Sequence, residues 1–117
     1  MGAIVTDRVT LTMSAIMEDG NGIGTDTIIR LLSNERRRYV IESILSERTL
    51  TKRQLLTRVC EREFGYETIP TDEIHRIQIG LKHNHLPKLA DYGVIEIDDE
   101  TITVGPNGDE LAPYLKI

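Results

Sequence analysis

The side chains that could do chemistry in this sequence are mainly cations, and they are unevenly distributed. Residues 30–63 hold nine Lys or Arg against five acids, although the chain of 117 residues carries a net charge of −5. Lys52 and Arg53 follow Thr51, whose spacing to Gln54 is that of a capping box and predicts a helix start. Because backbone amides at a helix N-terminus attract anions, Lys52 and Arg53 are the first candidates for phosphate contacts.

A run of three arginines provides further candidates for the same role. Successive residues on a helix point about 100° apart, so Arg36, Arg37 and Arg38 cannot all face one anion. Arg36 and Arg37 are the candidates for a phosphate contact. Arginines of the run that do not reach a phosphate are expected to pair with Glu35 or Glu42.

The helix expected over about residues 70–92 carries polar side chains that could read DNA bases. Its inward stripe is formed by Ile74, Ile77 and Leu81. The base-reading candidates are the polar side chains outside or beside that stripe: Arg76, Gln78, Lys82, His83 and Asn84. Arginine pairs with guanine and asparagine with adenine in the major groove, whereas Gln78 is nearer the buried side and ranks lower. The alternative is an ordinary solvated helix face, on which Asn84 caps a restart of the helix ahead of Pro87.

Other chemistries find little support in the residue pattern. His83 and His85 are two positions apart and point in different directions on a helix, and no Cys or acid cluster completes a tetrahedral metal site around His75 or either of them. The single cysteine, Cys60, belongs to an apolar helix stripe and is expected in the core. The sequence contains no nucleophile elbow, HExxH motif or P-loop. We therefore expect no enzyme activity, metal or cofactor, and identify no small-molecule ligand.

Several elements must position these side chains. Apolar spacing and capping residues predict helices over about residues 25–32, 34–47, 51–65 and 70–92. Thr25 or Asp26 should cap the first helix and Asn34 the second, and Pro87 should kink or restart the last. β-branched segments at 94–97 and 101–104, joined by acidic residues, predict a hairpin.

This order of helices followed by a hairpin predicts an α+β fold of the winged helix-turn-helix type, with a three-helix core and a two-stranded wing. The domain is expected over residues 25–104. Residues 1–24 should form an N-terminal extension, with a short strand at 4–13 and a glycine-rich linker, and residues 105–117 a C-terminal extension that is partly helical.

Two segments of the chain resemble a known family. Residues 32–41 (LSNERRRYVI) resemble the opening helix of the arsenical-repressor-like winged-helix regulators, and residues 85–95 (HLPKLADYGVI) resemble the end of their recognition helix and the entry to the wing. The two segments are especially similar to a group of small haloarchaeal winged-helix proteins, many of unknown function. The resemblance covers about residues 26–104. The sequence departs from a DNA-binding wing at Asp98, Asp99 and Glu100, where phosphate contacts favour Lys or Arg.

These features predict sequence-specific binding to double-stranded DNA by a cytoplasmic transcription regulator or repressor that acts as a dimer. The alternative is a winged-helix module that contacts another protein through its acidic wing and tail. The dimer is expected because a small core has little room to cover three apolar segments: the strand at 4–13 and residues 25–32 and 109–117. The apolar residues of the last two segments are Ile28, Ile29, Leu31, Leu32, Leu111, Tyr114, Leu115 and Ile117. The same segments could instead fold back on their own core. No apolar run approaches the length of a membrane span.

Overall fold

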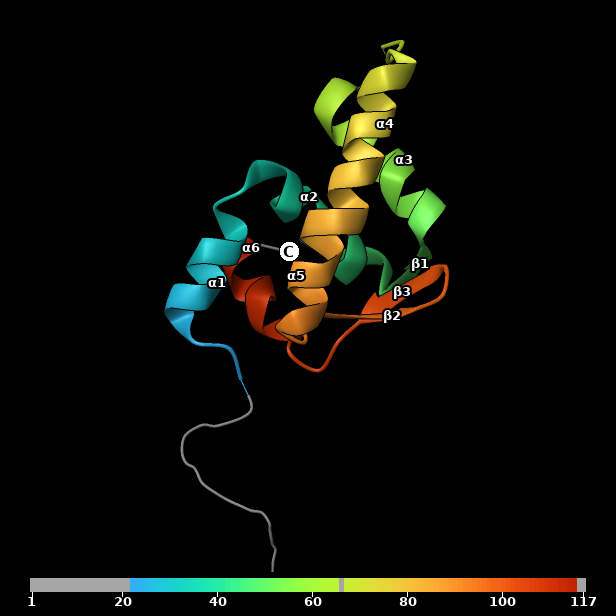
Figure 1. Cartoon of the computed structure of the whole chain (residues 1–117). Coiled ribbons are helices and arrows are strands. Elements are labelled where there is room, and N and C mark those ends of the chain that lie inside the picture. The colour runs from blue at the N-terminus through green and yellow to red at the C-terminus, as the bar shows by residue number, and fades with distance from the viewer. Residues whose placement is uncertain (1–21, 66, 116–117) are drawn as a thin grey trace, which may run out of the picture.

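The chain forms an α+β domain in which helices surround one side of a small antiparallel sheet (Figure 1). The computed structural model describes residues 22–65 and 67–115. The predicted strand at residues 4–13 lies outside the described residues. The elements, in chain order, are α1 (Thr25–Leu32), α2 (Glu35–Glu47), β1 (Thr49–Thr51), α3 (Lys52–Phe64), α4 (Thr71–Gly80), the π-helical turn η1 (Leu81–His85), α5 (Leu86–Asp91), β2 (Ile95–Asp98), β3 (Thr101–Val104), the 3-10 turn η2 (Gly108–Leu111) and α6 (Ala112–Leu115).

The sheet contains the predicted hairpin and one strand that the sequence pattern did not indicate. Its strand order is β1-β3-β2, and both neighbours of β3 are antiparallel to it. Ile97 pairs with Ile102 across the hairpin, and Leu50 of β1 pairs with the same Ile102 from the other side. A strand of three residues has too few positions to show a two-residue periodicity. β1 is recognisable only because β3 supplies a partner for its backbone.

The helix starts follow the predicted capping residues in two cases out of three. Asn34 Oδ1 accepts a hydrogen bond of 2.9 Å from the Arg37 backbone amide at the start of α2. Thr51 and Gln54 form the complete capping box of α3, with hydrogen bonds of 3.0 and 2.8 Å. The prediction for α1 was wrong, because Gly24 occupies the cap position without a side-chain hydrogen bond and both predicted capping residues lie inside the helix.

The last long helix changes its hydrogen-bond pattern just before Pro87, as predicted: a π-helical turn ends at His85, and α5 begins at Leu86. α4, η1 and α5 form one continuous rod in Figure 1. A proline lacks the backbone N–H that an α-helix requires, so the hydrogen-bond register must change around it. The change occurs in η1, where the Leu86 amide donates to the carbonyl of Leu81, five residues earlier. The extra residue in this turn also changes which side chains share a face of the rod.

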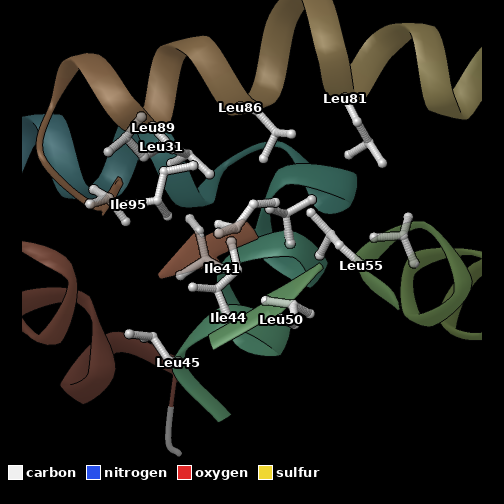
Figure 2. Close-up of a cluster of buried hydrophobic side chains, with 14 of the residues drawn as sticks. Leu31, Ile41, Ile44, Leu45, Leu50, Leu55, Leu81, Leu86, Leu89 and Ile95 are labelled. Atoms are coloured by element: carbon white, nitrogen blue, oxygen red, sulfur yellow. The ribbon is translucent and has the colours of Figure 1, made fainter. Parts of the chain in front are cut away.

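The core lies between the rod, α2 and the sheet (Figure 2). In this view Leu86 points from the rod toward the centre of the core, while Leu89 lies beside Leu31 of α1 and Leu81 lies above Leu55 of α3. The core also takes in α3 through the fully buried Leu55 and Val59, and the sheet through Leu50, Ile95 and Ile102. Cys60 is buried as predicted, and burial raises the pKa of its thiol.

Helix α1 and the segment that follows the hairpin both fold back on this core. Ile28 and Leu31 of α1 are buried, and Leu111 of η2 is fully buried although it lies beyond residue 104. Of the described apolar side chains from which a dimer was expected, Ile28, Leu31 and Leu111 are therefore covered by the chain's own core, and Leu32 and Leu115 pack against it. Ile29 and Tyr114 remain exposed. No helix of the described residues is long and apolar enough to cross a membrane.

Candidate functional site

A groove of about 490 Å³ lies where the start of α3, the rod and the β2–β3 hairpin meet. Its polar lining combines four of the residues selected from the sequence with one acid. The lining residues are Lys52, Arg53, Leu55, Leu56, Gln78, Leu81, Lys82, Leu86, Pro87, Ile97 and Glu100. Two helices that are separated in the sequence thus present cations to the same space.

The start of α3 holds Lys52 and Arg53 at the rim of this groove. The capping box fixes the first turn of the helix, and the Lys52 backbone amide donates a hydrogen bond of 2.9 Å to the carbonyl oxygen of Glu100. Arg53 is exposed and Lys52 half-buried. Both cations are therefore positioned by backbone contacts and keep side chains that an anion can reach.

The rod contributes Gln78 and Lys82, one helical turn apart, to the same groove. Gln78 ranked lowest of the base-reading candidates because it follows the buried Ile77. In the structure it is exposed on the side of the rod that faces α3. Arg76, His83 and Asn84 are exposed but do not line the groove. The predicted set is therefore divided between two faces of the rod.

Arg76 already has acidic partners on its own helix. Its guanidinium contacts the Glu73 carboxylate and lies 3.9 Å from that of Asp72. These acids precede it by three and four residues, the spacing at which helical side chains meet. Part of the charge that Arg76 would offer to DNA is thus neutralised within the helix.

Arg36 and Arg37, the other two candidates for phosphate contacts, are engaged in contacts within the domain. Arg36 forms a two-pronged ion pair with Glu63 of α3, with Nε–Oε2 and Nη2–Oε1 distances of 2.5 and 2.7 Å. Arg37 is buried, and its guanidinium donates to the carbonyls of Leu31 and Arg30 at 2.8 and 3.1 Å. Arg36 thus connects α2 to α3, and Arg37 connects α2 to α1. The sequence spacing could not indicate either partner.

The third arginine of the run also binds within the domain. Arg38 Nη1 donates a hydrogen bond of 3.0 Å to the carbonyl oxygen of Leu32. Glu42, one of the expected partners of the arginine run, pairs instead with Arg62 at 2.8 Å. The arginine run therefore holds α1 and α3 against α2.

The hairpin turn beside the groove is acidic. Asp98, Asp99 and Glu100 are all exposed, and Asp99 has a φ of 56° in the two-residue turn between the paired Asp98 and Thr101. Among the groove residues three cations face one acid, whereas the turn as a whole carries three acids. The anion-attracting part of this surface is thus confined to the α3 and rod side.

His85 lies in the π-helical turn, away from the groove lining. It is 5% exposed, and its Nδ1 has no hydrogen-bond partner among the described residues. Burial lowers its pKa, and the nearby Arg37 and Arg36 act in the same direction, so the imidazole is neutral near pH 7. Within the described part of the chain, no three His, Cys, Asp or Glu side chains are grouped so that they could hold a metal ion.

Sequence reasoning missed the apolar part of the groove. Leu56, Pro87 and Ile97 line it, and Ile97 is an isoleucine that the short hairpin leaves exposed. It is 38% exposed. Leu56 belongs to the apolar stripe of α3, and the pattern could not distinguish a residue at the edge of the core from one inside it.

Comparison with known proteins relates most of the chain to one family. A family model described as "Domain of unknown function (DUF7344)" matches residues 29–105. A search of curated proteins and a search of solved structures gave no match.

Proposed function

The chain belongs to the family of domains of unknown function DUF7344, and we propose that this member is a double-stranded DNA-binding protein of the winged helix-turn-helix type that regulates transcription. The order α2, β1, α3, rod and β2–β3 hairpin supports this fold assignment. In it α3 and the rod form the helix-turn-helix, the rod is the recognition helix and the hairpin is the wing.

One observation carries the functional proposal. Lys52 and Arg53 from the start of α3 and Gln78 and Lys82 from the rod line the same groove. A helix-turn-helix uses the start of its first helix for backbone contacts and its second helix for bases. Lys52 and Arg53 therefore take phosphates, while Gln78 and Lys82 take base edges. Arg76, His83 and Asn84 remain candidates for an outer row of base contacts.

The acidic turn of the wing limits how this protein can approach DNA. Asp98, Asp99 and Glu100 repel phosphates, and salt reduces this repulsion by shortening the screening length from about 10 Å at 0.1 M to about 3 Å at 1 M. The wing accordingly stays off the phosphate backbone, and the contacts are made by α3 and the rod.

A salt titration of binding tests the proposal. The full chain is titrated against fluorescent duplexes, both random and genomic, and the affinity is measured at several salt concentrations. The affinity should fall as salt rises, and some genomic fragments should bind more tightly than random duplex. Absence of binding to every duplex at low salt would reject DNA binding.

A protein-binding module is the second candidate function. The acidic wing turn and the exposed Ile97 beside it favour this alternative, because neither suits a phosphate backbone. A DNA-binding protein shows salt-dependent binding to random duplex, whereas a protein-binding module does not.

A homodimer also belongs to the proposal. Its candidate contacts are Ile29 and Tyr114, which are 57% and 47% exposed. Sedimentation of the full chain at tens of micromolar, compared with an Ile29→Asp variant, tests this contact. A monomer in the unmodified protein would reject the dimer.

A further inference from the structure

We propose that the groove between α3, the rod and the hairpin is also a binding site for a small organic anion with an apolar body, such as a medium-chain carboxylate. We further propose that this ligand and DNA exclude one another. The mutual exclusion rests on the proposed function, whereas the ligand site itself does not.

The apolar part of the lining is the first reason for this ligand class. Six apolar side chains form it: Leu55, Leu56, Leu81, Leu86, Pro87 and Ile97. Three of them, Leu55, Leu81 and Leu86, are part of the buried core. A phosphodiester backbone gains nothing from an apolar surface. Binding of an alkyl or aromatic body is strengthened in proportion to the apolar area that it removes from water. The volume of about 490 Å³ is in the usual range for small-molecule sites.

The charge of the rim is the second reason. Lys52, Arg53 and Lys82 line the same groove as the apolar side chains, and Glu100 is the one acid among the lining residues. The amide of Gln78 adds a hydrogen-bond donor. A ligand that complements this site therefore carries a negative group at one end and an apolar body at the other. A cationic ligand with the same body would meet three like charges.

The position of the groove links this ligand to the proposed DNA contacts. The residues that would hold the carboxylate are the same ones assigned to phosphates and base edges, so one anion excludes the other. The hydrogen bond from the Lys52 amide to the Glu100 carbonyl joins the α3 side of the groove to the hairpin.

The ligand site is tested with decanoate as the probe and nuclear magnetic resonance of the full chain as the readout, at decanoate concentrations below micelle formation. Decanoate should shift the amide signals of the groove residues and saturate, whereas butyrate and decyltrimethylammonium should not. Lys82→Ala should weaken decanoate binding about fivefold, the effect of one exposed ionic contact. Lys88→Ala, which removes an exposed lysine of α5 outside the groove lining, is the matched control and should leave the affinity unchanged.

Displacement of a labelled duplex by decanoate would support both the ligand site and the proposed function. Two other outcomes separate them. If duplex binds but decanoate shifts no groove signal, or shifts it no more than decyltrimethylammonium does, the ligand site is rejected and DNA binding stands. If decanoate saturates the groove but no duplex binds, the proposed function and the mutual exclusion fail and the ligand site stands.

Discussion

The backbone amide of Lys52 and the carbonyl oxygen of Glu100 are joined by a hydrogen bond of 2.9 Å. This bond connects the first residue of α3 to the turn of the β2–β3 hairpin. It places the strongest candidate for a phosphate contact beside a turn that repels phosphates. The behaviour of this surface toward anions is consequently a balance between Lys52 and Arg53 on one side and three neighbouring acids on the other.

Replacement of both Lys52 and Arg53 by alanine should weaken binding to all duplexes alike. Phosphate contacts carry no sequence information, and each one lost reduces the slope of log affinity against log salt by about one. The slope should therefore flatten by about two at most. Arg58→Ala is the control. Arg58 lies further along α3, pairs with Glu47 of α2 and does not line the groove. A slope identical to that of the unmodified protein would remove both residues from the interface.

Gln78→Ala should change base preference more than Arg76→Ala does. Gln78 reaches the groove, and a bidentate glutamine–adenine contact is worth about 1–3 kcal/mol of discrimination. Arg76 must first break its ion pairs with Glu73 and Asp72 before it can contact a base. Binding to a set of duplexes with single base-pair changes measures the difference. The reverse ranking would assign base reading to the outer face of the rod.

Neutralising the turn of the β2–β3 hairpin should raise the affinity for DNA. The variant Asp98→Asn, Asp99→Asn, Glu100→Gln keeps the backbone carbonyl that binds Lys52 and removes three charges. The gain should be largest at low salt and small near 1 M, where the screening length is about 3 Å. The control neutralises three exposed acids elsewhere: Asp26, Glu61 and Asp91. Equal gains in both variants would show that net charge, and not the hairpin turn, limits binding.

Arg37→Ala should lower the free energy of unfolding by about 1–3 kcal/mol, because it leaves the Leu31 carbonyl at the end of α1 without its buried donor, whereas the Arg30 carbonyl still accepts from Ser33. Arg38→Ala is a suitable comparison, since Arg38 also donates to a carbonyl of this segment but is half-buried rather than buried. Its cost should be smaller. Urea unfolding measures both, and a loss of DNA affinity without a loss of stability in Arg37→Ala would contradict its structural role.

The free energy of unfolding should decrease as the pH falls through about 6.5. Burial, with Arg37, Arg36 and Lys88, lowers the pKa of His85 in the folded protein, and Glu63 opposes them only in part. Below the ordinary histidine pKa, the unfolded chain takes up a proton at this position that the folded chain does not. Stability is therefore greatest above pH 6.5 and declines below it.

A His85→Leu variant isolates this contribution. Urea unfolding between pH 5 and 7.5 should show a smaller pH dependence in His85→Leu than in the unmodified protein. His83→Leu removes an exposed histidine from the same π-helical turn and serves as the control, which should keep the pH dependence. An unaltered pH dependence in His85→Leu would show that another group carries it.

Local sequence signals predicted most of the elements, because each depends on residues close together in the chain. The Asn34 cap and the Thr51–Gln54 capping box needed only three-residue spacings, and the hairpin needed only two β-branched segments and a short polar turn. The same reasoning placed Lys52 and Arg53 at a helix start, where the structure has them.

The tertiary structure alone decided which cations are free to meet an anion. Arg36 and Arg37 look equivalent to Lys52 and Arg53 as charges in the sequence, yet Glu63 lies 27 residues from Arg36, and no local pattern links them. The grouping of Gln78 with Lys52 likewise depends on how the rod packs against α3. Helix starts and turns depend on neighbouring residues, so the sequence by itself determined them. The partner of a cation depends on packing between segments that are distant in the sequence, so only the tertiary structure decided it.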